Sequence, residues 1–207
     1  MVKKHRVKED VREFCGYDFL VRLVEAMGHP MYKALVALLF ETGGRVSEVL
    51  RLRKSNFVRR KNYLEVREMP VLKRYRKVRR VPDSSRKSGF RWITERKEEF
   101  RSIPIPYDSP LVPYILDYLR TLRDNELLFP ITRQTAFNKI REAGKRLNGR
   151  LELYPHWFRA QKASQLASEY GFDVFGLKEF FKWIDDDMAE HYASLGARGL
   201  ARRMGLE

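Results

Sequence analysis

The stretch that decides the fold class is "NFVRRKNYLEVREM", which runs from Asn56 to Met69. Its two halves, "NFVRR" and "YLEVREM", contain β-branched and aromatic residues and are separated by Lys61-Asn62. Two such runs joined by a two-residue turn predict a β-hairpin. A further run, "FRSIPIP" (Phe100–Pro106), predicts a third strand. We therefore expect a small three-stranded antiparallel sheet.

Helical patterns lie on both sides of this sheet in the sequence. Before it, Pro30 opens an apolar segment that Gly43-Gly44 ends, since glycine suits the position just past a helix. After it, Ser109-Pro110 is typical of the start of another helix. The spacing of apolar residues predicts helices at residues 18–27, 31–41, 45–54, 111–123, 133–148, 156–170, 174–183 and 186–195. The expected fold is mainly α with a small three-stranded antiparallel sheet, an α+β class.

A basic segment, Leu72–Glu99, separates the second predicted strand from the third. Pro82 and Gly89 interrupt this segment, and both residues are typical of turns and loops. We interpret it as a long, mobile hairpin loop or insertion.

The chain is strongly basic. It contains 42 Lys or Arg against 27 Asp or Glu in 207 residues, which gives a net charge of +15. Nucleic acid is the polyanion that such a charge favours, because contacts with phosphates release counterions. A charged surface from a thermophilic organism is the alternative interpretation. Thermophile surfaces usually balance their signs, however, so the excess of positive charge favours a nucleic-acid partner.

Several classes of protein do not fit the composition. The single Cys15 rules out an internal disulfide and a cysteine-based metal cluster, and the four histidines never fall at ligand spacing. We expect no metal and no cofactor. The N-terminus lacks an apolar run of the signal-peptide kind, and the chain has none as long as a membrane span needs. We therefore expect a cytoplasmic protein.

Cationic and aromatic residues are the candidates for chemistry. Arg45 follows Gly43-Gly44 directly, and His156 and Arg159 are three residues apart, so both project from one helical face. Trp183 and Tyr192 are nine residues apart. Two guanidinium groups can hold the non-bridging oxygens of a phosphodiester, and a phenol can act as a nucleophile without a metal. Taken alone, this pattern supports a basic DNA-binding domain and suggests phosphoryl transfer.

Three sequence boxes resemble the tyrosine recombinases, the phage integrase family. "ETGGRVSEVLRLRKSNF" resembles the family's first arginine box, T-G-x-R-x-S-E-x-x-x-L, and "HWFR" resembles its H-x-x-R box. "FFKWIDDDMAEHY" resembles the last box, in which a His or Trp precedes the nucleophilic Tyr by nine residues. The resemblance runs from about Asp18 to Leu195, with the boxes in the family's order.

The resemblance implies a role for each catalytic position. Arg45 and Arg159 would hold the scissile phosphate, and His156 would bond to it or assist proton transfer. Trp183 would donate a hydrogen bond from its indole N–H, at a position that is more often His. Tyr192 would attack phosphorus and form a 3′-phosphotyrosine.

A lysine from the sheet's hairpin would protonate the leaving oxygen. Lys73 follows the second predicted strand at a suitable distance, and Lys97, before the third strand, is the alternative. His191 adjoins Tyr192, and we expect it to lie outside the site because adjacent helical residues point apart. The basic insertion would contact DNA through Lys73, Arg74, Arg76, Lys77, Arg79 and Arg80.

The sequence also departs from the family pattern. Ala160 stands where His commonly follows the second arginine, Gly44 where an apolar residue precedes the first, and Lys182 where Gly often precedes the Trp or His. Residues 1–17 are expected to be an N-terminal extension and residues 18–207 the catalytic domain. We do not expect in this chain the N-terminal core-binding domain that many members carry.

The resemblance implies a site-specific recombinase or integrase that acts on double-stranded DNA. We expect it to be associated with the nucleoid of a prokaryotic host, and we expect no membrane partner. Strand exchange would need a tetramer on DNA. Relaxation of DNA by a type IB topoisomerase uses the same chemistry and stays open, as does a non-catalytic basic DNA-binding protein of the same fold. The composition and the resemblance together suggest an archaeal or viral mobile element.

Overall fold

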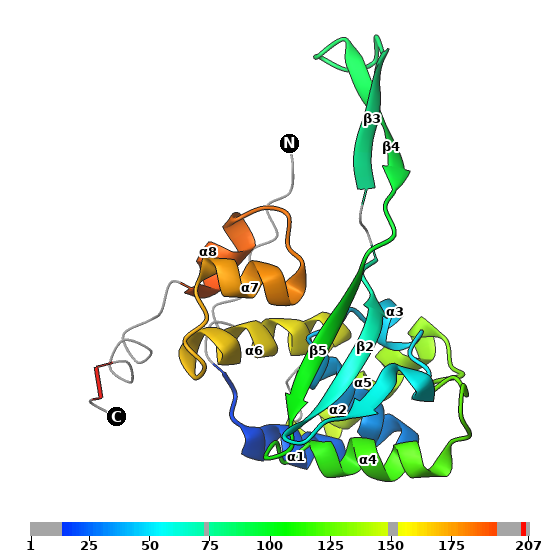
Figure 1. The fold of residues 1–207 in the computed structure, drawn as a ribbon, viewed down its shortest axis with the longest axis vertical. Helices are drawn as coiled ribbons and strands as arrows, with labels where there is room; N and C mark the ends of the chain where they lie inside the picture. The colour runs from blue at the N-terminus through cyan, green and yellow to red at the C-terminus, as the bar shows by residue number, and fades with distance from the viewer. Residues whose placement is uncertain (1–13, 73–74, 149–152, 194–203, 206–207) are drawn as a thin grey trace.

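The computed structural model describes residues 14–72, 75–148, 153–193 and 204–205 (Figure 1). The helices are α1 (Tyr17–Glu25), α2 (Pro30–Thr42), α3 (Val46–Val49), α4 (Val112–Thr121), α5 (Arg133–Asn148), α6 (Pro155–Ser168), α7 (Val174–Phe181) and α8 (Asp187–Ala193), with a 3-10 turn η2 (Lys54–Asn56). The strands are β1 (Phe57–Arg59), β2 (Tyr63–Pro70), β3 (Tyr75–Pro82), β4 (Phe90–Arg96) and β5 (Phe100–Pro106). The predicted fold class, mainly α with a small antiparallel sheet, is confirmed.

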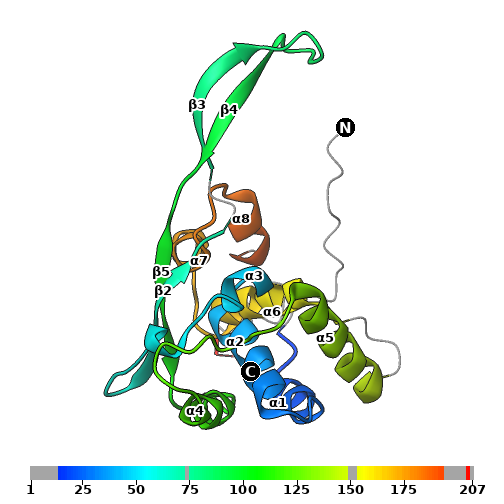
Figure 2. The ribbon, with the colours of Figure 1, turned by 90° about the vertical axis from the view of Figure 1, so that its right-hand side faces the viewer.

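The three-stranded sheet has the order β1-β2-β5, and both of its strand pairs are antiparallel. Alternate side chains of β5 are buried, namely Arg101, Ile103 and Ile105. The helices lie on one side of this sheet, as Figure 2 shows with β2 and β5 seen nearly edge-on. One face of the sheet therefore closes the core, which is the usual arrangement for an antiparallel sheet with a solvated outer face.

A bulge in β2 sets which residues face the core. Val66 pairs with Ile103, but the next pair is Met69 with Arg101, so β2 contains one extra residue. Glu68 has a positive φ of 52° within this bulge. The extra residue lets Val66 and Met69 both point inward although they are three apart.

Two helices form the centre of the core. In α2 every residue from Ala34 to Thr42 is buried, and in α6 every residue from Trp157 to Ala167 is buried. The two helices pack against each other, and α2 also packs against α1 and α4. Because α2 is apolar on most faces, its sequence showed no clear amphipathic stripe, which is typical of a fully enclosed helix. Among the described residues, no helix is long and apolar enough to cross a membrane.

The segment between the second and third predicted strands was interpreted as a long, mobile hairpin loop or insertion, and the structure shows a hairpin insertion with two regular strands of its own. Here β3 and β4 form a two-stranded antiparallel ribbon, paired from Tyr75–Arg96 to Pro82–Phe90. The N–H of Asp83 donates to the carbonyl of Gly89 at 3.0 Å and closes the turn. The strand signal in the sequence is weak here, because pairs of basic residues separate the apolar residues of "YRKVRRVP" and break the alternation typical of a strand. Lys73 and Arg74 lie outside the described residues.

The third predicted helix is also shorter than expected. Residues 45–54 were predicted as helical, but α3 ends at Val49. Past this point the chain pairs with the segment before α5: Arg53 forms a β-bridge with Leu127, and the N–H of Leu128 donates to Leu52 at 3.0 Å. These tertiary bonds outweigh the local helical preference of "RLRK".

The turn after α2 depends on Gly43. Gly43 has a φ of 55°, and a Cβ atom built there would lie 2.4 Å from Cε1 of Phe181. We expect Gly43→Ala to lower the free energy of unfolding by about 2–4 kcal/mol, because left-handed strain adds to overpacking. Urea unfolding measures this loss.

Gly28→Ala is the matched control for this prediction. Gly28 also has a positive φ, of 72°, but a Cβ atom there would meet nothing within 4 Å. Its substitution should cost about 1 kcal/mol, from backbone strain alone. Equal losses in the two variants would contradict the close approach of Phe181.

Candidate functional site

The Arg45 side chain is held by the buried carboxylate of Glu48. Arg45 precedes α3, and its backbone N–H donates to Oε2 of Glu48 at 2.9 Å while its Nη1 donates to Oε1 at 2.8 Å. The backbone N–H of Leu72 also donates to Oε1, at 3.0 Å. Glu48 is 1% exposed, whereas the Arg45 side chain is 30% exposed. Glu48 thus fixes Arg45 at the surface and ties it to the chain that leaves β2.

Arg159 lies deeper, on the buried helix α6. Its Nη1 donates to the carbonyl of Gly43 at 2.8 Å, and its Nη2 donates to the carbonyl of Phe181 at 3.1 Å. These carbonyls belong to the ends of α2 and α7, where helix termini leave C=O groups unpaired. Arg159 therefore joins three segments that are far apart in sequence.

A third arginine, Arg101 on β5, completes a cationic cluster. It donates to the carbonyls of Phe180 and Thr42 and lies 3.9 Å from Oε2 of Glu48. Burial lowers the pKa of Arg101 to about 10, with Glu48 opposing the shift and Arg45 adding to it. Burial also lowers the pKa of Arg159 well below its usual value; Arg101 and Arg45 lower it further, against Glu48 and Tyr192.

This cluster has an unbalanced charge. The guanidinium groups of Arg45, Arg101 and Arg159 act on one another, and Glu48 is the carboxylate that opposes them. A partly buried excess of positive charge is costly unless an anion meets it. The arrangement therefore suits a bound phosphate group, since guanidinium groups match its oxygens in pairs.

Trp183 and Tyr192 lie against this cluster in an aromatic column. The Phe181 and Trp183 rings stack at 4.5 Å between centroids, and the Trp183 and Tyr192 rings stack at 5.8 Å. The guanidinium carbon of Arg159 lies 4.6 Å from the Phe181 ring centre and 5.6 Å from that of Trp183. Lys182 turns the chain at the end of α7 with a φ of 53°, which lets Trp183 fold back onto Phe181.

The phenol of Tyr192 is buried and protonated at neutral pH. Tyr192 is 7% exposed. Burial raises its pKa to about 12, and the positive charge of Arg159 partly offsets that rise. The tyrosine thus lies within the electrostatic reach of one predicted phosphate-binding arginine.

Two cavities open beside Arg45. One, of about 180 Å³, is lined by Arg45 with Val71, Leu72, Lys182, Trp183, Ile184, Asp185 and Met188. The other, of about 320 Å³, is lined by Arg45, Val46, Ser47, Arg133, Phe137, Tyr154, Pro155 and His156. Arg45 therefore stands between Trp183 on one side and the exposed His156 on the other.

The structure brings five of the six predicted catalytic positions to this region and leaves the lysine open. Arg45, His156, Arg159, Trp183 and Tyr192 converge as described above. Lys73 lies outside the described residues. Its alternative, Lys97, is exposed in the connection from β4 to β5, near the point where Val71 bonds to Glu99.

Three other predictions can be compared with the structure in this region. His191 was expected to lie outside the site because adjacent helical residues point apart; its ring in fact meets that of Tyr192 edge to face at 5.1 Å between centroids, and its exclusion from the site stays a prediction. Of the predicted DNA contacts, Arg79 and Arg80 are exposed on β3, Arg76 and Lys77 belong to the same strand, and Arg74 lies outside the described residues. Within the predicted N-terminal extension, Phe14 stacks on Phe40 of the core at 5.6 Å.

The sequence reasoning missed Glu48 and Arg101 as parts of the site. Glu48 was visible as the acid of the R-x-S-E pattern, three residues after Arg45, where a helix places it within reach. Arg101 had a weaker signal: a charged residue at an inward position of the strand "FRSIPIP". A charge at such a position needs a buried partner, and here it has Glu48.

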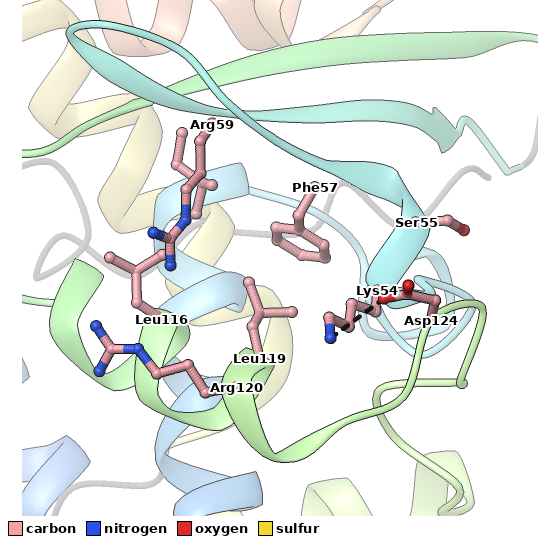
Figure 3. Close-up of a pocket in the computed structure, with 9 residues that line it drawn as sticks. Lys54, Ser55, Phe57, Arg59, Leu116, Leu119, Arg120 and Asp124 are labelled. Atoms are coloured by element: carbon pink, nitrogen blue, oxygen red, sulfur yellow. Dashed lines mark ion pairs between the residues drawn. The ribbon is translucent and has the colours of Figure 1, made fainter.

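A separate cavity lies between β1 and α4 (Figure 3). Its volume is about 340 Å³, and it is lined by Lys54, Ser55, Phe57, Arg59, Leu64, Leu116, Leu119, Arg120 and Asp124. Lys54 pairs with Asp124 at 3.3 Å on one side of the opening. This cavity shares no lining residue with the two beside Arg45, so it is distinct from the cationic cluster.

Comparison with known proteins assigns the chain to a family. The model of the phage integrase family matches residues 18–198, which is most of the chain. This chain belongs to the phage integrase family. No curated protein matches the sequence.

Solved structures of tyrosine recombinases share the fold of this phage integrase family member. XerA recombinase is 21% identical, with a TM-score of 0.62, covering 92% of this chain and 61% of that one. XerH bound to its difH substrate is 15% identical, with a TM-score of 0.59, covering 86% of this chain and 49% of that one. The catalytic domain of bacteriophage HP1 integrase is 17% identical, with a TM-score of 0.53, and is covered over 95% of its length. This chain thus spans about half to three fifths of XerH and XerA, and nearly all of the HP1 catalytic domain.

The charge imbalance in this family member predicts a response to Glu48→Gln. The substitution keeps the shape of the side chain but leaves three guanidinium groups without their carboxylate. We expect the free energy of unfolding to fall by about 3 kcal/mol, because breaking a buried pair leaves uncompensated charge. Sulfate should restore part of this loss by binding the folded state. Urea unfolding with and without sulfate, at matched ionic strength, measures both effects.

Asp117→Asn provides the control. Asp117 pairs with Arg120 on the exposed surface of α4, with side chains 67% and 65% exposed. Its loss should cost less than about 1 kcal/mol and show no specific rescue by sulfate. Sulfate that stabilised both variants equally would contradict an anion site at the cluster.

The buried phenol predicts a specific response to alkaline pH. The pKa of Tyr192 is raised from 10.0 to about 12 in the folded protein, so the folded state holds this proton more tightly than the unfolded state does. The stabilisation is complete below about pH 10 and is lost as the pH rises toward about 12. Stability should therefore decline less in Tyr192→Phe than in the wild type, by up to about 2 kcal/mol.

Denaturant unfolding of the two proteins at pH 9 and at pH 11.5 gives this difference directly. Other tyrosines and lysines titrate in the same range, but they are common to both proteins and cancel. Parallel declines in the two proteins would show that the phenol titrates normally.

Proposed function

We propose that this chain cleaves and rejoins DNA through a 3′-phosphotyrosine on Tyr192, as the catalytic part of a site-specific recombinase or integrase. The observation that supports it most is the cationic cluster of Arg45, Arg101 and Arg159 beside a buried phenol. Family membership and the fold of XerH, a site-specific recombinase solved with its difH substrate bound, support the same substrate class.

The proposed reaction is a transesterification. The Tyr192 oxygen attacks phosphorus and loses its proton, the bond from phosphorus to the 5′ oxygen breaks, and that oxygen leaves as a hydroxyl. Rejoining is the reverse, with a 5′-hydroxyl attacking the phosphotyrosine. The number of phosphoester bonds does not change, so the step needs no external energy source.

The guanidinium groups stabilise the transition state in this scheme. Arg45, partly exposed between two cavities, donates to the non-bridging oxygens, while Arg159 is fixed by the carbonyls of Gly43 and Phe181. Donors already in place are worth most when negative charge develops on those oxygens. The charge of Arg159 also favours the phenolate that forms as Tyr192 attacks.

The remaining groups handle protons and position the phosphate. His156 faces the same cavity as Arg45 and would bond to the phosphate or assist proton transfer. Trp183 would donate through its indole N–H, which holds a phosphate oxygen but cannot shuttle a proton. Either Lys73 or Lys97 would protonate the leaving 5′ oxygen as a general acid.

The partner in this proposal is double-stranded DNA in a prokaryotic nucleoid. The ribbon residues Arg76, Lys77, Arg79 and Arg80, with Lys73 and Arg74, would contact the duplex. Full strand exchange would use a tetramer of protomers on two DNA sites. A type IB topoisomerase would relax supercoils with the same nucleophile, and a non-catalytic relative would only bind DNA.

A nicked duplex that traps the covalent intermediate tests the proposal. We expect the wild type to form a protein–DNA adduct on a denaturing gel, and Tyr192→Phe to bind the duplex with no adduct. Arg45→Lys keeps the charge but loses the paired donors, so we expect adduct formation to slow by about 100-fold with little change in binding. Anisotropy of a labelled duplex measures binding.

The outcomes separate the alternatives. An adduct that persists in Tyr192→Phe would rule out Tyr192 as the nucleophile. Duplex binding without any adduct in the wild type would indicate the non-catalytic protein. Relaxation of supercoiled plasmid regardless of sequence, without recombinant products, would indicate a topoisomerase.

A further inference from the structure

Among the described residues, no helix and no other sheet forms a layer on either face of the β3–β4 ribbon. Its strands pair with each other in a separate two-stranded sheet, and the ribbon projects away from the helices as a continuation of β2 and β5 (Figures 1 and 2). An isolated two-stranded ribbon is only marginally stable in water. The β3–β4 ribbon also exposes two large apolar side chains, Val78 and Trp92, which are 44% and 43% exposed. Such a ribbon is suited to burial against a partner.

The two faces of the ribbon differ in chemistry. Residues that pair directly share a face, so Arg80 with Trp92 and Pro82 with Phe90 form one face. On this face the guanidinium carbon of Arg80 lies 3.1 Å from the centre of the Phe90 ring. The opposite face carries Arg79 opposite Ile93 and Val81 opposite Arg91. The first face therefore presents an aromatic and guanidinium surface, and the second an aliphatic and cationic one.

The charge of the ribbon identifies the class of partner. Residues 75–96 contain eight Lys or Arg and two acids, an excess of six positive charges in about a tenth of a chain whose net charge is +15. One of the acids, Asp83, is engaged at the turn, where it accepts from the Ser85 N–H at 3.1 Å. A polyanion complements this surface. A second copy of the same chain, which also carries +15, does not.

We propose that the β3–β4 ribbon is a DNA-reading arm that enters the major groove next to the cleavage site, with the Arg80–Trp92 face toward the bases. The inference rests on the proposed DNA substrate and adds a groove-binding element to it. The major groove, about 12 Å wide, admits a two-stranded ribbon, whereas the minor groove, about 6 Å wide, is too narrow without deformation. Guanidinium groups donate to guanine edges, and aromatic side chains contact thymine methyl groups.

The length of the ribbon sets how far the arm reaches. Strands of 8 and 7 residues extend about 25 Å at about 3.3 Å per residue. At about 3.4 Å of duplex per base pair, that distance corresponds to about seven base pairs beyond the active site. The arm would thus add contacts on one side of the scissile phosphate, where the catalytic groups make none.

Trp92 is a built-in probe for this contact. The chain has three tryptophans, of which Trp157 is buried and Trp183 lies half-buried in the aromatic column. Acrylamide quenching of the full chain, with Trp92→Phe as the reference, isolates the Trp92 signal. We expect that signal to lose its accessibility to acrylamide when a duplex binds.

Salt dependence gives an independent measure. Arg79→Ala/Arg80→Ala should lower the slope of log K against log salt for duplex binding by about one, because a phosphate contact contributes about 0.9 and Arg80 faces the bases. Arg59→Ala/Arg120→Ala is the charge-matched control. Both of its arginines line the separate cavity between β1 and α4 (Figure 3), and the slope should not change.

The wild type is assayed for the nicked-duplex adduct under the same conditions, so the two proposals can fail separately. Trp92 that stays fully quenchable while the adduct forms would overturn the arm and leave the catalytic proposal standing. Trp92 that becomes protected with rising protein concentration in the absence of DNA would assign the ribbon to a second copy. Protection lost when a minor-groove ligand occupies the duplex would overturn the major-groove assignment. A wild type that binds no duplex would refute both proposals.

Discussion

One buried carboxylate organises the cationic half of this molecule. Glu48 accepts from the backbone and side chain of Arg45, accepts from the N–H of Leu72, and lies 3.9 Å from Arg101. It therefore holds three parts of the molecule together: the Arg45 side chain at the surface, the chain at Leu72 that leads from β2 toward the ribbon, and the strand β5 through Arg101. Because its single negative charge cannot neutralise three guanidinium groups, the folded protein has a local excess of positive charge that a bound anion would stabilise. The stability of the fold is thus linked to the phosphate-containing substrate that we propose.

Arg159 holds distant segments of the chain together by donating to their backbone carbonyls. Its hydrogen bonds reach the carbonyls at the ends of α2 and α7, which would otherwise lack partners. The glycine at the end of α2 is needed for this geometry, since Phe181 occupies the space where a side chain would lie. The ends of α2 and α7 and the buried charge of Arg159 thus depend on one another. A family signature such as "TGGR" therefore reflects packing as much as chemistry.

The sequence allowed some elements to be predicted better than others, for physical reasons. The predicted bounds of α5 agree with the structure because its apolar stripe is regular, and β2 and β5 were recognisable from their β-branched residues. The ribbon was missed because it has no core face and hence no alternation of apolar and polar residues. Helix α3 is shorter than predicted because Leu52 and Arg53 form backbone hydrogen bonds and a β-bridge with the distant segment at Leu127 and Leu128. Such long-range bonds cannot be predicted from the local sequence pattern. For the site, motif order gave the residues their proposed roles, but the stacking of Tyr192 on Trp183 and the place of Arg101 depend on contacts between distant segments.

The bulge at Glu68 has a consequence for how this part of the molecule can evolve. In a strand the side chains alternate with a period of two, so one inserted residue inverts the facing of everything beyond it. The same alternation applies within the arm, where it separates the Arg80–Trp92 face from the opposite face. Adding or removing an even number of residues in each strand of the arm would keep these two faces and alter only the reach, whereas an odd change in one strand would move its side chains to the other face. The projecting hairpin can therefore be lengthened or shortened in steps of two without disturbing the packing of the core.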